Sequence, residues 1–156
     1  MYFLKYTIRA NNMINIRHIG IVVNCFETMV EFYKNILGMK ELSRSIEKSR
    51  YIDTIINKKD LEIEIIKLMF EEGGTIELLH YRADNKEEYR DNKIWDKGLS
   101  HIAISVKDVM KEYLRLTNLG VNFLSKPEIS PDNYAKVCFC RDPEGNYIEL
   151  VQVLEA

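Results

Sequence analysis

Two histidines and two glutamates occupy matching places in a sequence that repeats itself. The run His18-Ile-Gly-Ile-Val-Val is echoed by His101-Ile-Ala-Ile-Ser-Val, and each half later contains Ile-Glu-Leu. Imidazole nitrogens and carboxylate oxygens together suit a borderline divalent ion such as zinc, nickel, cobalt, iron or manganese. The repeat therefore predicts a metal site, built by pseudo-symmetry, in a metal-dependent enzyme. Its four ligands would be His18, Glu77, His101 and Glu149.

Each of these residues also has a structural interpretation when it is taken alone. A histidine on a strand is commonly a hydrogen-bonded structural residue, and a glutamate on a strand usually faces solvent. The recurrence of both residue types in matching places favours the metal site. Both glutamates are flanked by Ile and Leu, which predicts partial burial. A metal ion offsets the cost of burying such a carboxylate.

The elements that position these residues follow from the periodicity of apolar side chains. In the first half, alternation predicts strands over 16–23, 39–45, 60–70 and 75–81. Helical spacing predicts a helix over 27–37 that ends at Gly38, and a short helix is favoured for the insertion at 50–57. Within 60–70 the apolar alternation shifts by one residue, which predicts a β-bulge.

The second half repeats this order. Its predicted strands cover 100–106, 121–124, 135–141 and 146–154, with a polar loop over 126–134. Asp108 is placed to cap the helix that Gly120 ends, and 142–145 has the composition of a tight turn. On both first strands the face that carries the histidine also carries small residues, whereas the other face carries Ile and Val. The histidine faces are therefore expected to line a cavity.

The fold class predicted from this order is α+β, with two tandem β-α-β-β-β modules forming a curved sheet around a metal-binding cavity. The expected organisation is an N-terminal extension at 1–13, a first module at 14–82, a linker at 83–98 and a second module at 99–156. The two modules together form one structural domain.

Composition restricts the partners and the compartment. The 156 residues carry a net charge of −2, which gives no reason to expect nucleic acid or an anionic membrane as a partner. The N-terminal segment is too short and mixed for a signal peptide, so a cytoplasmic protein is expected. The three cysteines, Cys25, Cys138 and Cys140, do not form a Cys-x-x-Cys motif and are expected to be small core residues.

The repeated pattern resembles the vicinal oxygen chelate superfamily, which includes glyoxalase I, methylmalonyl-CoA epimerase, extradiol dioxygenases and antibiotic-resistance proteins. The resemblance covers nearly everything from Ile16 to Val153 and is most specific in the two histidine runs and in Arg141-Asp-Pro-Glu-Gly-Asn-Tyr-Ile-Glu-Leu. Matched position by position, the four predicted ligands fall where glyoxalase I carries its own. Epimerases are similar but typically have Gln at the position of Glu77.

The resemblance implies a glyoxalase I-like enzyme of the lactoylglutathione lyase type, acting on a small-molecule substrate. The metal would stabilise an enediolate while an α-oxoaldehyde thiol adduct is isomerised. Glu149 would be the base that leaves the metal, and Glu77 would be its symmetric counterpart. The alternatives are a methylmalonyl-CoA epimerase-like isomerase, an iron-dependent dioxygenase and a non-catalytic antibiotic-binding resistance protein.

Two further expectations depend on the assembly and on one carboxylate. A homodimer is expected because an open sheet commonly buries an edge or a face against a second copy. The metal site then lies either within one chain or between two chains. Asp53 falls near the additional carboxylate of the epimerases, and its alternative interpretation is a surface residue in an irregular segment.

Overall fold

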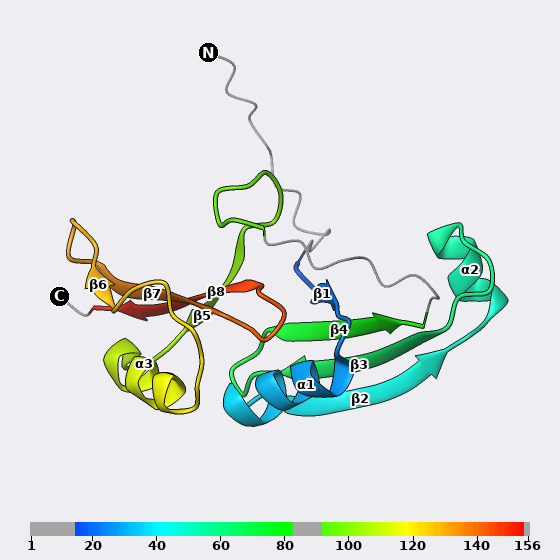
Figure 1. Cartoon of the computed structure of the whole chain (residues 1–156), viewed down its shortest axis with the longest axis horizontal. Helices are drawn as coiled ribbons and strands as arrows, with labels where there is room; N and C mark the ends of the chain where they lie inside the picture. Colours follow the sequence, from blue (N-terminus) through cyan, green and yellow to red (C-terminus); the bar gives the residue numbers. More distant parts are fainter. Residues whose placement is uncertain (1–14, 83–91, 155–156) are drawn as a thin grey trace, which may run out of the picture.

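A computed structural model describes residues 15–82 and 92–154 of the chain. The extension predicted at 1–13 and most of the linker predicted at 83–98 lie outside the described residues. The first module contains β1 (Ile19–Val22), α1 (Phe26–Glu31), the π-helical segment η1 (Phe32–Ile36), β2 (Lys40–Glu47), α2 (Arg50–Ile56), β3 (Ile63–Met69) and β4 (Thr75–Tyr81). The second module contains β5 (His101–Ser105), α3 (Val109–Asn118), β6 (Glu128–Ile129), β7 (Ala135–Arg141) and β8 (Tyr147–Val153). Figure 1 shows the two modules side by side.

Each module holds one four-stranded sheet with the same topology. The strand orders are β1-β4-β3-β2 and β5-β8-β7-β6. In both sheets the first strand pairs in parallel with the last, and the other neighbours are antiparallel. This repeated order confirms the α+β fold class with two β-α-β-β-β modules. Within the described residues the strands form two separate sheets, and neither sheet closes on itself.

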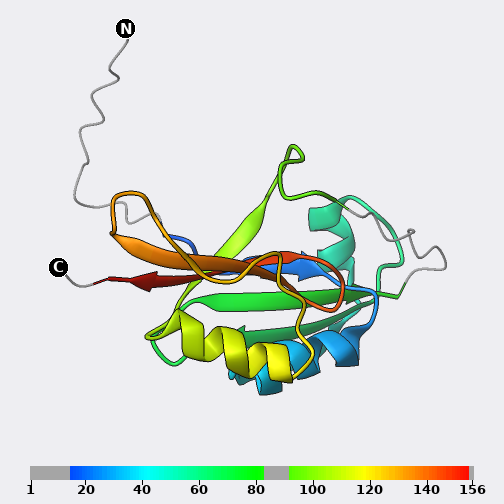
Figure 2. The same cartoon turned by 60° about the vertical axis from the view of Figure 1, so that its left-hand side comes forward.

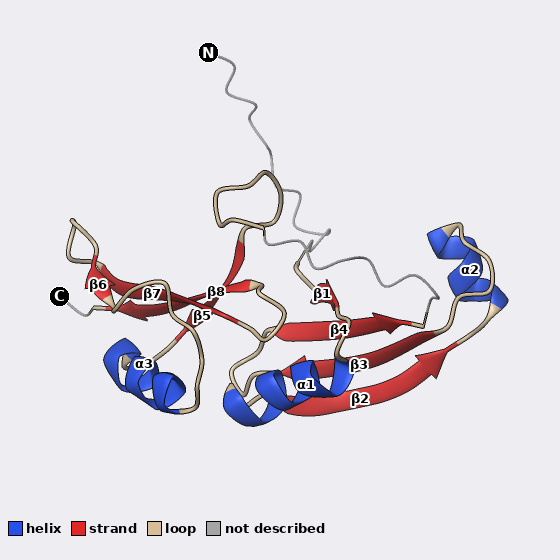
Figure 3. Ribbon diagram, in the orientation of Figure 1, coloured by secondary structure: helices blue, strands red, loops and turns tan. Residues whose placement is uncertain are grey.

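The helices α1 and α3 cover the same side of the two sheets, as Figures 1 and 2 show. They bury one apolar core that runs through both modules, with Met29, Tyr33 and Leu78 from the first and Val109, Cys140 and Leu150 from the second. Ribbon colouring by secondary structure makes the two-layer arrangement plain in Figure 3. The opposite face of each sheet is termed the ligand face below, since it carries the predicted metal ligands.

Polar contacts reinforce this shared core. The Tyr33 hydroxyl on η1 donates a 2.9 Å hydrogen bond to Oδ2 of Asp142, which follows β7. The carboxylate of Glu144 accepts bonds from the backbone N–H groups of Asn24 and Cys25, which precede α1. A turn of the second module therefore caps the first helix of the first module. The modules are joined as one unit.

Two predicted elements of the second half differ in the structure. Residues 121–124 do not form a strand, because only Phe123 makes a bridge there, to Cys140. The strand β6 lies instead at Glu128–Ile129, inside the predicted polar loop, where it pairs with Lys136 and Val137 of β7. The strands β4 and β7 and the helix α2 were predicted correctly. Asp108 caps α3 as expected, accepting a 3.0 Å bond from the Lys111 N–H.

The prediction of a β-bulge in the third strand is wrong. The pairing of β3 with β4 is regular along its whole length, and the irregularity lies in β2, between Glu41 and Ser43. The apolar alternation of β3 shifts for another reason, since this strand is covered on both faces. Ile66 packs in the main core, whereas Ile63 packs with Ile52 of α2 on the ligand face.

The three cysteines differ in how far they are buried. Cys138 and Cys140 are buried as predicted, but Cys25 is exposed because it stands at the N-cap position of α1. No helix in the described part of the chain is long and apolar enough to cross a membrane.

Candidate metal centre

The first pair of predicted ligands is assembled by the parallel pairing of β1 and β4. Gly20 lies opposite Glu77 in the register, so His18, two residues earlier, is on the same face. A Cβ at Gly20 would lie 3.3 Å from Cδ1 of Leu79, so the glycine makes room for that side chain. Nε2 of His18 lies 3.2 Å from Oε2 of Glu77.

The second pair repeats this geometry on β5 and β8. Ala103 lies opposite Glu149, and His101 is again two residues earlier on the shared face. Nε2 of His101 lies 3.3 Å from Oε2 of Glu149. The structure therefore brings the same two atoms into the same contact in both modules, as a duplicated site requires.

Both pairs are partly exposed on the ligand face, at a depth that suits ion binding. The glutamate side chains are 13% and 20% exposed, and the histidine side chains are 33% and 35% exposed. The carboxylates are therefore shielded while the imidazoles reach solvent. Imidazole nitrogen and carboxylate oxygen are both ligands of divalent cations, so each pair offers two donor atoms to such an ion.

One chain does not bring the four predicted ligands together. Among residues 15–82 and 92–154, no three His, Cys, Asp or Glu side chains are grouped so that they could hold one metal ion. A cavity of about 420 Å³ lies between the modules, but its lining includes His101 alone of the four. The donor types fit a metal, and each module supplies half of the donor set. The four-ligand site stays a prediction.

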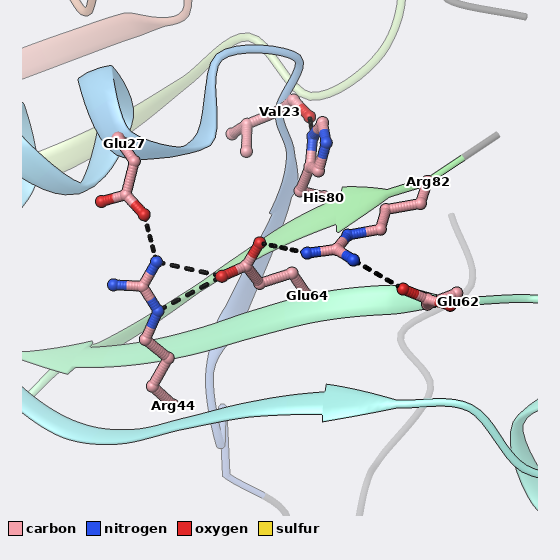
Figure 4. A network of polar contacts seen from close by, with 7 residues as sticks. All are labelled: Val23, Glu27, Arg44, Glu62, Glu64, His80 and Arg82. Atoms are coloured by element: carbon pink, nitrogen blue, oxygen red, sulfur yellow. Dashed lines mark hydrogen bonds and ion pairs between the residues drawn. The ribbon is translucent and has the colours of Figure 1, made fainter. Parts of the chain in front are cut away.

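The remaining histidine, His80, is excluded from the ligand face. It is three residues from Glu77 on β4 and therefore points to the helix side of the sheet. There its Nδ1 contacts the carbonyl oxygen of Val23 at 3.0 Å, and its ring lies 6.1 Å from that of Phe26. Figure 4 shows this contact beside a network of charged side chains.

The charged network in Figure 4 has a structural role. Arg44 of β2 pairs with Glu27 of α1 and, at 3.0 Å, with Glu64 of β3. Arg82 extends the network to Glu62, at 2.7 Å. Each guanidinium drawn there faces carboxylates of the chain itself, so the network joins α1 to the sheet rather than presenting a site for a ligand.

Asp53, the candidate for an epimerase-type base, lies on α2 and is engaged by the backbone. Its two carboxylate oxygens accept 3.0 Å bonds from the N–H groups of Asp60 and Leu61. These bonds fasten the end of α2 to the start of β3, where Asn57 and Asp60 both have positive φ angles. Asp53 thus has a clear structural function at the turn.

Sequence reasoning missed one residue that contacts the predicted ligands. Nζ of Lys67 lies 3.2 Å from Oε1 of Glu77, and the two residues are directly opposite each other on β3 and β4. The signal was present in the sequence. The turn at Gly73-Gly74 fixes which residue of the preceding strand faces Glu77, and that residue is a lysine.

Comparison with known proteins identifies the family of the chain. Residues 15–150 match the family model described as the Glyoxalase/Bleomycin resistance protein/Dioxygenase superfamily. A lactoylglutathione lyase of Pseudomonas aeruginosa is 28% identical over 132 residues, covering 79% of this chain and 73% of that protein. The uncharacterised protein YraH of Bacillus subtilis is 31% identical over 141 residues, covering 87% and 96%.

The structural comparison supports the fold. A glyoxalase family protein from Bacillus cereus superposes with a TM-score of 0.82 at 20% identity, covering 94% of this chain and 98% of the other. At this level of identity the likeness concerns the fold alone.

Proposed function

Because the chain belongs to the glyoxalase/bleomycin resistance protein/dioxygenase superfamily, we propose that it is a metal-dependent lyase or isomerase of the glyoxalase I type. The substrate would be an α-oxoaldehyde thiol adduct, as the name of the related lactoylglutathione lyase suggests. The observation that carries the proposal is the duplicated pair, with Nε2 to Oε2 distances of 3.2 Å and 3.3 Å.

The proposed ligands are His18, Glu77, His101 and Glu149. Two imidazole nitrogens and two carboxylate oxygens suit one divalent ion of zinc, nickel, cobalt, iron or manganese. Two carboxylates also balance the charge of such an ion, so neutral oxygen ligands on it would exchange readily with the oxygens of a substrate.

We propose further that each complete site forms between two copies of the chain. The first module of one copy would contribute His18 and Glu77, and the second module of the other would contribute His101 and Glu149. The shared core and the Tyr33–Asp142 bond hold the two modules of one chain side by side. Turning their ligand faces toward each other would break this buried core, whereas a second copy can supply the missing half without that cost.

In the proposed reaction Glu149 is the group that moves a proton. Its carboxylate removes the proton from the carbon next to a carbonyl and returns it to the neighbouring carbon. His101 and His18 stay in place as neutral donors, and Glu77 is the symmetric carboxylate. A divalent ion, when bound, would supply Lewis acidity at the carbonyl oxygen. The shielding of the Glu149 side chain, which is 20% exposed, limits exchange of its proton with water.

Elemental analysis of the purified protein, with His101→Ala as a control, tests the proposal. We expect about one divalent ion per chain, a large loss of bound metal in the variant, and isomerisation of the methylglyoxal–thiol adduct by the loaded protein. Absence of bound metal after reconstitution with nickel, zinc, iron and manganese would refute the proposal that the protein is a metal-dependent enzyme. Bound metal without isomerisation, together with exchange of the α-proton of an acyl-CoA, would instead favour the epimerase.

A further inference from the structure

The two glutamates of the duplicated pairs differ in their second oxygen. In Glu77, Oε2 faces His18 at 3.2 Å while Oε1 faces Nζ of Lys67, also at 3.2 Å. The carboxylate is thus held from both sides. In Glu149, Oε2 faces His101 at 3.3 Å, and no ion pair within residues 15–82 and 92–154 involves its other oxygen.

The difference arises at one position of the duplicated frame. Lys67 lies opposite Glu77 in the β3–β4 register, and Phe139 lies opposite Glu149 in the β7–β8 register. Phe139 presents no cation to its glutamate. Its ring instead meets the ring of His101 edge to face, with centroids 5.3 Å apart and planes at 85°. The residue opposite the glutamate is therefore a cation in the first module and an aromatic ring in the second.

A lysine at this place acts on the orientation of its glutamate. The Lys67 side chain is 36% exposed and that of Glu77 is 13% exposed, so the contact lies at the edge of the shielded region. A carboxylate that binds a metal through one oxygen keeps the other oxygen for a hydrogen-bond donor, and such donors fix the direction of the ligand. Here the second oxygen of Glu77 faces the ammonium group of an ion pair at 3.2 Å, and the attraction between opposite charges favours one direction of the carboxylate.

We propose that Lys67 is a positioning residue that holds Glu77 as a fixed metal ligand, and that this makes the two glutamates unequal. The inference rests on the proposed function. Glu77 stays in place because its outer oxygen is bound by the lysine. Glu149, with Phe139 as its neighbour, is the carboxylate free to leave and accept the proton.

The expected change in metal affinity when Lys67 is replaced follows from two opposing effects. Loss of a group that orients a metal ligand typically weakens metal affinity about 10- to 100-fold. The positive charge of the lysine opposes a nearby cation, and its removal recovers part of that loss. We therefore expect Lys67→Met to weaken metal binding by about tenfold, at the lower end of the range.

A double-mutant cycle on metal affinity tests whether Lys67 acts through Glu77. Zinc dissociation constants are measured by chelator competition for Lys67→Met in the wild-type, Glu77→Gln and Glu149→Gln backgrounds. A glutamine keeps an oxygen ligand, so affinity stays measurable. Lys67→Arg retains the charge and the donors. Lys40→Met is the matched control, because Lys40 is on β2 of the same sheet and pairs with the exposed Glu71 in the turn after β3.

We expect the weakening of zinc binding by Lys67→Met to persist in the Glu149→Gln background. In the Glu77→Gln background this weakening should be absent, since only the relief of charge repulsion remains there. Lys67→Arg should keep most of the wild-type affinity, and Lys40→Met should match the wild type. An equal effect in both backgrounds, or none in the wild type, overturns the inference while leaving the proposed function intact. Failure of the wild-type protein to bind zinc overturns both. Circular dichroism of the metal-free variants verifies that they fold. If Lys67→Met does not fold, Lys67→Gln replaces it in the same cycle.

Discussion

The hydroxyl of Tyr33 donates a 2.9 Å hydrogen bond to the carboxylate of Asp142, across the boundary between the two modules. Tyr33 is fully shielded from solvent, and Asp142 is 4% exposed. Burial raises the pKa of both groups, and the Asp142 carboxylate adds to the rise at Tyr33. The bond therefore joins two groups that keep their protons more strongly than usual, at a position where the modules depend on each other.

Tyr33→Phe should destabilise the protein by about 1–2 kcal/mol, because it removes one hydrogen bond to a buried carboxylate and adds no new contact. Urea unfolding measures this change as a lower midpoint with an unchanged slope. Tyr51→Phe is the control, since Tyr51 is 66% exposed and should leave the midpoint where it was. Equal midpoints for both variants would contradict a role for the bond in joining the modules.

Thiol labelling should distinguish Cys25 from the other two cysteines. Burial raises the pKa of Cys138 to about 11 and that of Cys140 to about 12, so at pH 8 both remain protonated and react slowly. A thiol-specific disulfide reagent at pH 8 should titrate one thiol in the native chain and three after unfolding. Cys25→Ala should abolish the native signal. Rapid labelling of that variant would show that β7 opens to solvent.

Asp53→Ala should lower stability rather than proton transfer. The substitution leaves the N–H groups of Asp60 and Leu61 without their acceptors, which we expect to cost about 1–2 kcal/mol. Thermal unfolding reports this loss, and Asp53→Asn should recover part of it. The epimerase alternative predicts an additional effect, because there the same variant would also lose exchange of the α-proton.

Mixed dimers should reveal whether a metal site is shared between chains. In a dimer of one His18→Ala chain and one His101→Ala chain, a shared arrangement gives one site that lacks both histidines and one site that keeps both. Neither variant alone retains a complete site. Refolding equal amounts together makes about half of the dimers mixed, and each mixed dimer keeps one of its two sites, so the mixture should recover roughly a quarter of the wild-type metal. Plasma emission spectrometry of the mixture measures this recovery. A monomeric chain that binds one ion with all four ligands would exclude sharing.

The sequence was most informative where local signals were strong. The two-glycine turn and the Asp-Pro-Glu-Gly turn delimit β4 and β7, and both strands lie where alternation predicted them. The helix α2 was also predicted, in the insertion that makes the first half of the sequence longer than the second. Parallel pairing of the first and last strands then brought each histidine to its glutamate, which the repeat had implied.

Other features depend on contacts that local patterns do not contain. The shift of alternation in β3 came from α2 covering the ligand face near Ile63, and periodicity alone could not separate this from a bulge. The π-helical segment η1 and the two-residue strand β6 are too short to give a periodic signal. The contact of Lys67 with Glu77 needed the register between strands, and the separation of the four ligands into two pairs needed the packing of whole modules.

The helix α2 stands at one end of the first module, where it packs on Ile63, and the second module has only the turn at residues 130–134 between β6 and β7. A perfectly duplicated frame would offer a bound molecule two interchangeable orientations. With a helix on one side only, a molecule placed between a first and a second module meets different surroundings at its two ends. In the proposed shared site, the two ends of a bound molecule would therefore be distinguished by a connecting segment, at a distance from the residues that the duplication preserved.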